Sequence, residues 1–267
     1  MDGIQLRFTN SRSVVSLILI GLLSMTIGGC GSGGDSPPAS SPTSAPVATT
    51  AEGLWRTGST ETNRTILGAV LDDGTYYFFY SEQAARTRIG GLVQGNSTAN
   101  KGIFTSDNAK DFDFEGGVVQ SETIAANYTE RQSLNGPVLS AGTGAFITTF
   151  DAAYDTPPSL ASLAGAYTGQ SGNPENGGVD PTTLTVAADG GFSGIANSCS
   201  FSGTMTPRVR GNIFDLSVTF TGAIPCLHAG ETLTGIAYLD EPNKHLLAAA
   251  LTSDRTEVVL ITGIRPL

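Results

Sequence analysis

The sequence predicts an all-β protein in which two tandem antiparallel up-and-down barrels follow a disordered tether. Short segments rich in β-branched and aromatic residues alternate with small residues from residue 51 to the C-terminus, and no long stretch has a helical period. Asp-Gly pairs stand between apolar segments, which is a strong hairpin signal. The segment 53–58 (GLWRTG) is similar to 165–169 (GAYTG), which indicates two domains of one architecture.

The first 29 residues have the pattern of a signal peptide. An uncharged apolar run from Ser13 to Ile27 follows Arg7 and Arg12 and ends in small residues. It is about 15 residues long, whereas a membrane-spanning helix needs roughly 20. We therefore expect residues 1–29 to be cleaved rather than to span a membrane.

The end of this segment, Ile27-Gly28-Gly29-Cys30, resembles the lipobox of bacterial lipoproteins. The resemblance implies that Cys30 becomes the acylated N-terminus, with palmitate-type chains as a membrane anchor. Gly31 follows the cysteine where lipoproteins of the inner membrane usually carry Asp. This favours the outer membrane, with the periplasmic and the surface-exposed orientation both open.

The expected domain boundaries follow from composition. Residues 30–50 are dominated by Gly, Ser, Pro and Thr, which predicts a disordered linker carrying the lipid. The N-terminal barrel-like domain should cover 51–155 and the C-terminal one 159–267. The boundary falls near Pro157 and Pro158, because proline cannot serve a central strand.

Each domain offers enough short strands to close a barrel, which removes the exposed sheet edges. In the first domain we expect a hairpin at Asp73-Gly74, and in the second a hairpin at Asp189-Gly190 and a final turn at 253–255. The predicted strands of the first domain are 53–58, 64–71, 75–81, 88–95, 101–105, 112–118, 121–129 and 143–150. Those of the second are 165–170, 182–187, 191–196, 199–206, 212–221, 231–239, 245–252 and 256–264.

Trp55 and Tyr167 stand at matching places in the two opening strands. They resemble the opening Gly-x-Trp of lipocalin-like barrels, which implies that each plugs the base of its barrel. The folded part as a whole resembles uncharacterised two-domain β-barrel-like bacterial lipoproteins.

If the lipid occupies Cys30, Cys199 and Cys226 remain as a pair in an oxidising compartment. We expect them to form a disulfide, which would contribute roughly 3 kcal/mol. Two free thiols, or half of a metal site together with His228, are the alternatives.

The acidic balance excludes one class of partner. After removal of residues 1–29 the chain has 12 basic and 23 acidic residues, so nucleic acid is repelled. The acidity is typical of a soluble extracytoplasmic domain, and an acidic face for a basic partner or a cation is the alternative.

Few residues suggest catalysis. His228 and His245 are the two histidines, and no Gly-x-Ser-x-Gly element accompanies them. The segment 111–115 (DFDFE) places three carboxylates on one face of a strand. A cation site or a paired-carboxylate site is the functional interpretation, and a solvated strand face is the favoured one. We therefore expect no catalytic residues, no metal and no cofactor.

The aromatic run 76–80 (YYFFY) is the strongest candidate for binding. Alternation places Tyr76, Phe78 and Tyr80 on one face of a strand and the other two side chains on the opposite face. One set should fill the core. The set Tyr76, Phe78 and Tyr80 is our candidate binding patch, unless neighbouring elements cover it.

Together these features predict a non-enzymatic lipoprotein of the outer membrane that binds a protein, a glycan or a small apolar ligand. A structural component of an envelope or secretion assembly is the alternative, and a hydrolase ranks last. Some surface lipoproteins that capture host proteins are tethered β-barrels, but this chain lacks their Gly-rich signature.

Overall fold

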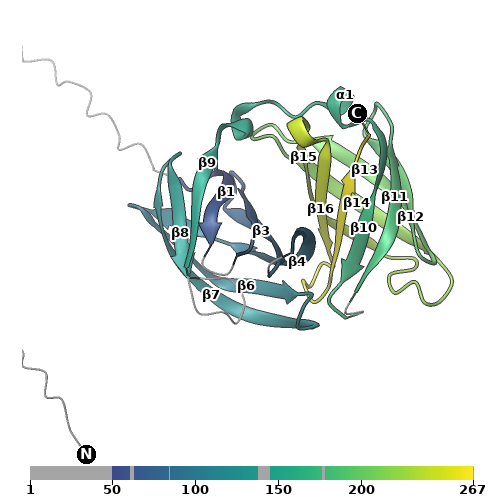
Figure 1. Cartoon of the computed structure of the whole chain (residues 1–267), viewed down its shortest axis with the longest axis horizontal. Coiled ribbons are helices and arrows are strands. Elements are labelled where there is room, and N and C mark those ends of the chain that lie inside the picture. Colours follow the sequence, from purple (N-terminus) through teal and green to yellow (C-terminus); the bar gives the residue numbers. More distant parts are fainter. Residues whose placement is uncertain (1–49, 61–62, 84, 138–144, 176–177, 267) are drawn as a thin grey trace, which may run out of the picture. The chain divides into compact units, whose positions relative to one another are not determined.

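The computed structural model describes residues 50–266 apart from 61–62, 84, 138–144 and 176–177 (Figure 1). The expected signal peptide (1–29), Cys30 and the expected linker up to residue 49 lie outside the described residues. Residues Pro46–Leu267 belong to one compact unit that contains two closed antiparallel barrels. The all-β, two-barrel prediction is confirmed. No helix in the described part of the chain is long and apolar enough to cross a membrane.

The first barrel is an up-and-down ring in which β1 pairs with β9 and β4 pairs with β6. The short strand β5 adds to the end of β6 beyond its pairing with β4. The strands are β1 (Gly53–Thr60), β2 (Ile66–Val70), β3 (Thr75–Glu82), β4 (Ala85–Asn96), β5 (Thr98–Asn100), β6 (Ile103–Asp113), β7 (Val118–Thr129), β8 (Ser133–Pro137) and β9 (Ala145–Asp151).

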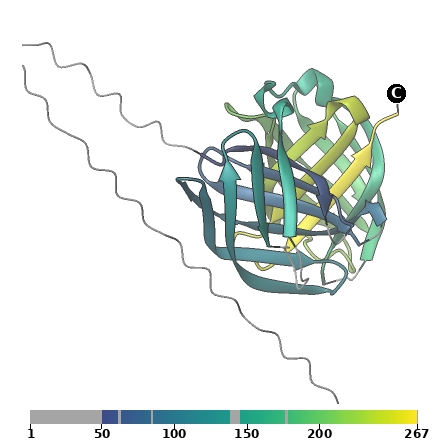
Figure 2. The same cartoon turned by 60° about the vertical axis from the view of Figure 1, so that its left-hand side comes forward.

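The second barrel closes through the pairing of β10 with β17. Each strand pairs with the next along the chain, as the run of tight turns predicts. The strands are β10 (Gly165–Asn173), β11 (Gly178–Val186), β12 (Gly191–Ala196), β13 (Cys199–Pro207), β14 (Phe214–Gly222), β15 (Thr232–Asp240), β16 (His245–Leu251) and β17 (Val258–Ile264). In Figure 2 the strands that form the wall of this barrel run obliquely.

Three details of the first barrel differ from the predicted strands, one of which is that the short strand β5 was not predicted. The segment 112–118 is not a strand of its own, because its first two residues end β6 and residues 114–117 form the turn to β7. Strand β8 was missed, since its sequence SLNGP lacks apolar alternation. Its pairing with both β7 and β9 holds it in the sheet despite this weak local preference.

The opening strands of the two barrels, β1 and β10, each carry an aromatic side chain that makes the same kind of hydrogen bond. Trp55 donates a hydrogen bond from Nε1 to the carbonyl oxygen of Ala51, four residues upstream, at 3.0 Å. Tyr167 donates from its hydroxyl to the carbonyl of Leu163, also four residues upstream, at 2.6 Å. Both aromatic side chains are fully buried. Each therefore ties the chain entering its barrel to the barrel interior.

A short connection leads from one barrel to the other. It contains a 3-10 turn, η1 (Ala152–Asp155), and the single-turn helix α1 (Leu160–Leu163). The side chain of Asp151 caps the first by accepting from Ala153 N, and the side chain of Ser159 caps the second by accepting from Ser162 N. A further 3-10 turn, η2 (Glu241–Asn243), joins β15 to β16.

Candidate functional site

The predicted binding residues Tyr76, Phe78 and Tyr80 do not form an exposed patch. All three belong to the core of the first barrel and are at most 4% exposed, and Tyr80 also borders the pocket between the barrels described below. They pack in this core with Trp55 and Phe104, among other apolar residues. The prediction of a surface patch is wrong because closure of the sheet places this face of β3 in the barrel interior.

The opposite face of β3 is also covered. Tyr77 and Phe79 point out of the first barrel, yet each is only 7% exposed. They belong to an apolar cluster shared by the two barrels, to which the second barrel contributes residues of β15, β16 and β17. The shared cluster includes Leu67, Tyr77, Phe79, Leu92 and Phe112 of the first barrel and Ile236, Tyr238, Ala249, Leu251 and Leu260 of the second.

Arginine side chains bind the two barrels together around this cluster. Arg56 of β1 donates from Nη2 to the hydroxyl of Tyr238 at 2.7 Å and is ion-paired with Asp151. Arg208, in the turn after β13, donates to Asp72 of the first barrel at 2.8 Å. Hydrogen bonds to charged donors contribute more than neutral ones, so these contacts help to fix the interface.

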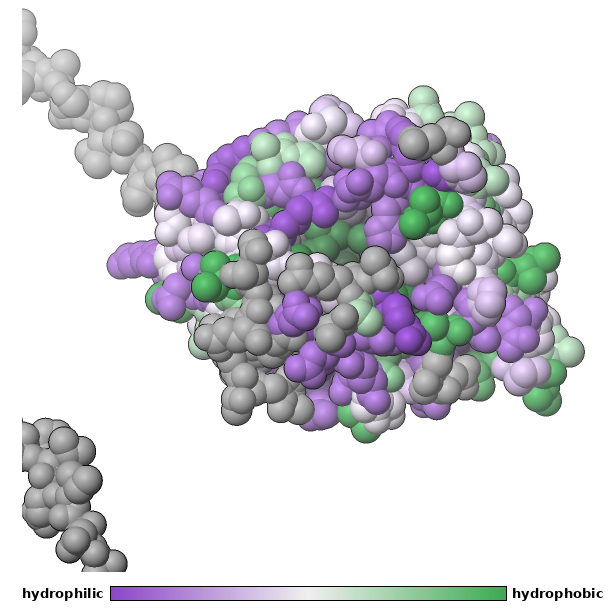
Figure 3. All heavy atoms as spheres, viewed as in Figure 1, coloured by the Kyte–Doolittle hydropathy of each residue, from purple (hydrophilic) through white to green (hydrophobic). Residues whose placement is uncertain are grey.

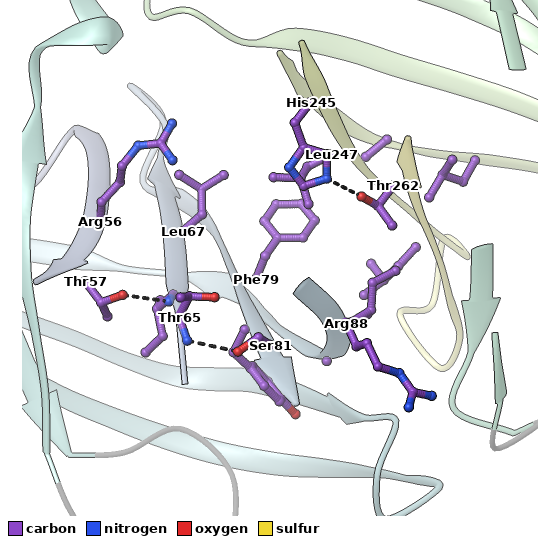
Figure 4. Close-up of a pocket in the computed structure, with 17 residues that line it drawn as sticks. Arg56, Thr57, Thr65, Leu67, Phe79, Ser81, Arg88, His245, Leu247 and Thr262 are labelled. Atoms are coloured by element: carbon purple, nitrogen blue, oxygen red, sulfur yellow. Dashed lines mark hydrogen bonds between the residues drawn. The ribbon is translucent and has the colours of Figure 1, made fainter. Parts of the chain in front are cut away.

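Next to this apolar cluster, the barrels leave a pocket of about 290 Å³ between them. This volume is near the lower end of small-molecule sites, which span ~300–1,000 Å³. Strands β2, β3 and β4 form one wall, and β16 and β17 form the other (Figure 4). A hydrophobic recess bordered by hydrophilic residues is visible near the centre of Figure 3, where the two barrels meet. The apolar lining consists of Ile66, Leu67, Phe79, Ile89, Leu247, Ala248, Leu260 and Ile261.

Polar groups stand around this apolar lining. His245 Nε2 is hydrogen-bonded to the hydroxyl of Thr262, and Arg56 lies on the same side of the pocket (Figure 4). Burial lowers the pKa of His245, the charge of Arg56 lowers it further, and the charge of Asp240 acts in the opposite direction. The lowered pKa favours neutral imidazole.

The other side of the pocket carries hydroxyl groups and one more cation. Thr57 accepts a hydrogen bond from Ile66 N, and Ser81 accepts one from Thr65 N. Arg88 lines this side as well and is ion-paired with Glu82 at 3.2 Å. The arrangement combines an apolar body with polar ends, which is the chemistry of a site for a small amphipathic molecule.

The prediction that the carboxylates of segment 111–115 lie on a solvated strand face is wrong for Asp111. Asp111 points into the first barrel and is fully buried, where it accepts a hydrogen bond from Tyr80 at 2.7 Å. A β-bulge between Ser106 and Ala109 shifts the alternation of β6 and turns Asp111 inward. Burial raises the pKa of Asp111 to about 7, opposed by the hydrogen bond from Tyr80. Its Oδ2 has no hydrogen-bond partner among the described residues.

The remaining carboxylates of this segment do not join Asp111 in a site. Asp113 accepts a hydrogen bond from Glu115 N within the turn after β6. Glu115 is ion-paired with Arg64. In the described part of the chain, no group of three His, Cys, Asp or Glu side chains is arranged to hold a metal ion.

His228 occupies a different place from His245. It is buried next to the mouth of the second barrel, with Nδ1 3.2 Å from Glu231 and Nε2 3.2 Å from Glu257. The contact to Glu257 does not have hydrogen-bond geometry. Neither histidine is favoured over the other as a catalytic residue by its sequence context, and of the two only His245 lines the pocket between the barrels.

Cys199 and Cys226 form a disulfide, as expected, with their Cα atoms 5.0 Å apart. Cys199 begins β13 and Cys226 lies in the connection between β14 and β15. The bond therefore holds this connection against the end of the second barrel. The metal-site alternative for Cys226 and His228 does not apply, since the disulfide uses the thiol.

The pocket residues Phe79, Leu247 and Leu260 were not selected from the sequence, although a signal for them exists. Strand β16 and the start of β17 are apolar at consecutive positions rather than alternate ones, as is β3. Such strands are buried on both faces. In a barrel this means that something covers the outer face, which here is the neighbouring barrel.

No protein-family model matches this chain, and no curated protein matches it either. The class of protein is therefore defined by the fold and the pocket alone: a double β-barrel with an amphipathic pocket between its barrels.

Proposed function

We propose that this protein is a non-enzymatic lipoprotein of the outer membrane that binds a small apolar ligand in the pocket between its barrels. The observation that carries the proposal is one pocket that combines an apolar lining, which includes Leu67, Phe79, Leu247 and Leu260, with polar groups at its ends. Small-molecule sites commonly have an apolar lining with few polar groups and lie at domain interfaces.

The distribution of exposed apolar residues favours a small ligand over a protein or an assembly partner. Among the described residues, the large exposed apolar side chains are spread over both barrels, from Ile103 of β6 to Val209, Ile224 and Ile264. Single exposed apolar residues are normal on soluble proteins, whereas docking surfaces form contiguous patches.

The hydrogen bond between His245 and Thr262 is the one observation that favours a hydrolase. A nucleophile and its base must lie within hydrogen-bond reach, and the base must be held by a third group. Thr262 lies within β17 rather than at a sharp turn, and it is paired with neighbouring strands on both sides. The carboxylate of Asp240 is engaged by Arg56 and Asn243. Binding is therefore the better-supported function.

A neutral fluorescent probe, N-phenyl-1-naphthylamine, tests the binding site. The protein is the chain from residue 30 onward with Cys30→Ser, which removes the expected lipid acceptor and keeps the compact unit from Pro46 intact. We expect saturable binding of one probe per chain. Leu247→Trp, which fills the pocket, should abolish it, and Ile195→Trp, at an exposed position of the second barrel, should not. Equal binding by both variants would refute the site.

Two measurements on intact cells test the location. Radioactive palmitate should label the full-length chain and should fail to label Cys30→Ser. Protease added to whole cells then separates the two orientations, because only a surface-exposed chain loses its folded part to digestion. Turnover of a 4-nitrophenyl ester that depends on His245 would overturn the non-enzymatic assignment.

A further inference from the structure

The pocket is basic at its ionisable positions although the protein is acidic. The chain has 24 acidic and 14 basic residues. Yet the ionisable side chains that line the described pocket, apart from the phenol of Tyr80, are those of Arg56, Arg88 and His245, and no carboxylate is among them. The carboxylates of Asp151, Asp240 and Glu82 pair with these arginines from outside the lining. What the lining offers a ligand is therefore N–H donors rather than a net positive charge, and such donors favour an acceptor group such as a carboxylate.

Two of these three basic groups lie at the same end of the pocket. Arg56 comes from β1 and His245 from β16, so they approach from opposite barrels, while the guanidinium of Arg88 points away (Figure 4). Arg56 contacts Asp240 at 3.3 Å, and Asp240 is the cross-strand partner of His245, so the two basic side chains lie near each other. Thr262 stands beside His245 as a hydroxyl partner. This end can therefore donate several hydrogen bonds to one acceptor group.

The guanidinium of Arg56 is held in place before any ligand arrives. Its Nε contacts Asp151, and its Nη2 contacts Tyr238 at 2.7 Å and Asp240 at 3.3 Å. A guanidinium has five N–H donors, and these contacts use Nε and Nη2. The Arg56 side chain is still 36% exposed. Preorganised donors of this kind bind a carboxylate with little loss of conformational entropy.

We propose that the ligand of this pocket is an amphiphile with a single carboxylate group, bound at the end formed by Arg56, His245 and Thr262, with its apolar body against Leu67, Phe79 and Leu247. The inference rests on the proposed function, because it requires that a small apolar ligand binds between the barrels. It adds the charge, the chemical class and the orientation of that ligand.

The test compares three molecules of equal chain length: decanoate, decan-1-ol and decylamine. Each displaces N-phenyl-1-naphthylamine from the Cys30→Ser chain at pH 7.5. We expect decanoate to displace the probe at a concentration at least tenfold lower than decan-1-ol, and decylamine to be the weakest. If decan-1-ol or decylamine matches decanoate, the carboxylate proposal fails and the apolar site stands. If none of the three displaces the probe, both proposals fail.

Variants locate the carboxylate. His245→Gln and Arg56→Gln should each weaken decanoate binding at least tenfold more than decan-1-ol binding, whereas the control Arg88→Gln should keep the preference for the acid. Because Arg56 also contacts the second barrel, a circular dichroism spectrum and the decan-1-ol affinity verify that its variant is folded. Equal weakening of acid and alcohol by His245→Gln would overturn the proposal.

A second readout follows the imidazole itself. Asp240 and Arg56 are the charged groups that act on His245, and a bound carboxylate would add a negative charge beside it. Saturation with decanoate should therefore raise the pKa of His245 measured by nuclear magnetic resonance, and saturation with decan-1-ol should not. A pKa that is unchanged by decanoate places the carboxylate elsewhere and overturns the proposal.

Discussion

Arg255, in the turn between the last two strands, donates hydrogen bonds to both the side chain and the main chain of Gln94 in the first barrel. The distances are 2.6 Å from Nε to Oε1 and 2.8 Å from Nη2 to the carbonyl oxygen. Gln94 is only 5% exposed, so its amide group depends on this partner. The same Nη2 also reaches the carbonyl of Asn108 on β6 at 2.8 Å. One side chain of the second barrel thus fixes two strands of the first.

We therefore expect Arg255→Met to destabilise the protein by about 1–3 kcal/mol, because a buried amide oxygen would lose its donor. The free energy of unfolding in urea measures the change. Arg131→Met is the matched control, since Arg131 and its partner Asp155 are each about half exposed, where an ion pair contributes little to stability. Similar losses in the two variants would contradict a special role for the contact to Gln94.

Asp111 should make the stability of the fold depend on pH. Folding raises its pKa to about 7, so between about pH 4 and pH 7 the folded chain keeps a proton that the unfolded chain has lost. Stability from this group therefore falls as pH rises through this window, by roughly 1.4 kcal/mol per pH unit, and becomes constant above it.

The variant Asp111→Asn should lack that slope. Urea unfolding of both proteins at four pH values from 4.5 to 7.5 gives the difference, in which the contributions of all other groups cancel. Asp189→Asn serves as the control, because Asp189 is in an exposed hairpin turn that asparagine also fits. Parallel stability curves for wild type and Asp111→Asn would show that Asp111 is ionised in the fold.

The disulfide should stabilise the second barrel substantially. Cys199 and Cys226 are 27 residues apart, and closing a loop of this length contributes about 3–4 kcal/mol in the chain-entropy description. Cys199→Ala combined with Cys226→Ala should lower the unfolding free energy by that amount, and reduction of the wild type should lower it similarly. Cys30→Ser should have no effect on unfolding, and a loss in that variant would argue against the assigned pairing.

The hydroxyl of Tyr167 should contribute measurably to the stability of the fold. Tyr167→Phe removes the donor to the buried carbonyl of Leu163, for an expected loss of about 1–3 kcal/mol. Tyr77→Phe is the comparison, since no hydrogen bond of the Tyr77 hydroxyl is present in the described structure, and thermal unfolding should distinguish the two. If the two variants have the same melting temperature, the hydrogen bond from Tyr167 to Leu163 does not contribute to the stability of the fold.

Much of the fold could be predicted from local patterns. Asp73-Gly74 and Asp189-Gly190 lie in tight turns between paired strands, because positive φ is accessible to glycine. The similarity of Gly53-x-Trp55 to Gly165-x-Tyr167 predicts two barrels of one architecture. Strand β8 was missed because its stability comes from its neighbours rather than from its own residues.

The candidate site could not be predicted in the same way. Alternation along β3 correctly separates Tyr76, Phe78 and Tyr80 from Tyr77 and Phe79, but it does not say what covers either face. Likewise, the direction of Asp111 follows from the bulge after Ser106, which only the pairing of β6 with β7 defines.

The sequence by itself determined the all-β class, the two-barrel repeat and the pairing of Cys199 with Cys226, since these depend on residue period, turn chemistry and the number of cysteines. Only the tertiary structure decided that His245, Arg56 and Phe79 share one pocket. These residues come from three strands far apart in the chain, and packing of one barrel against the other brings them together. Consecutive apolar residues in β3, β16 and β17 indicate that both faces of these strands are covered, but no local pattern identifies the other barrel as the cover, because that packing depends on the complementarity of two curved surfaces.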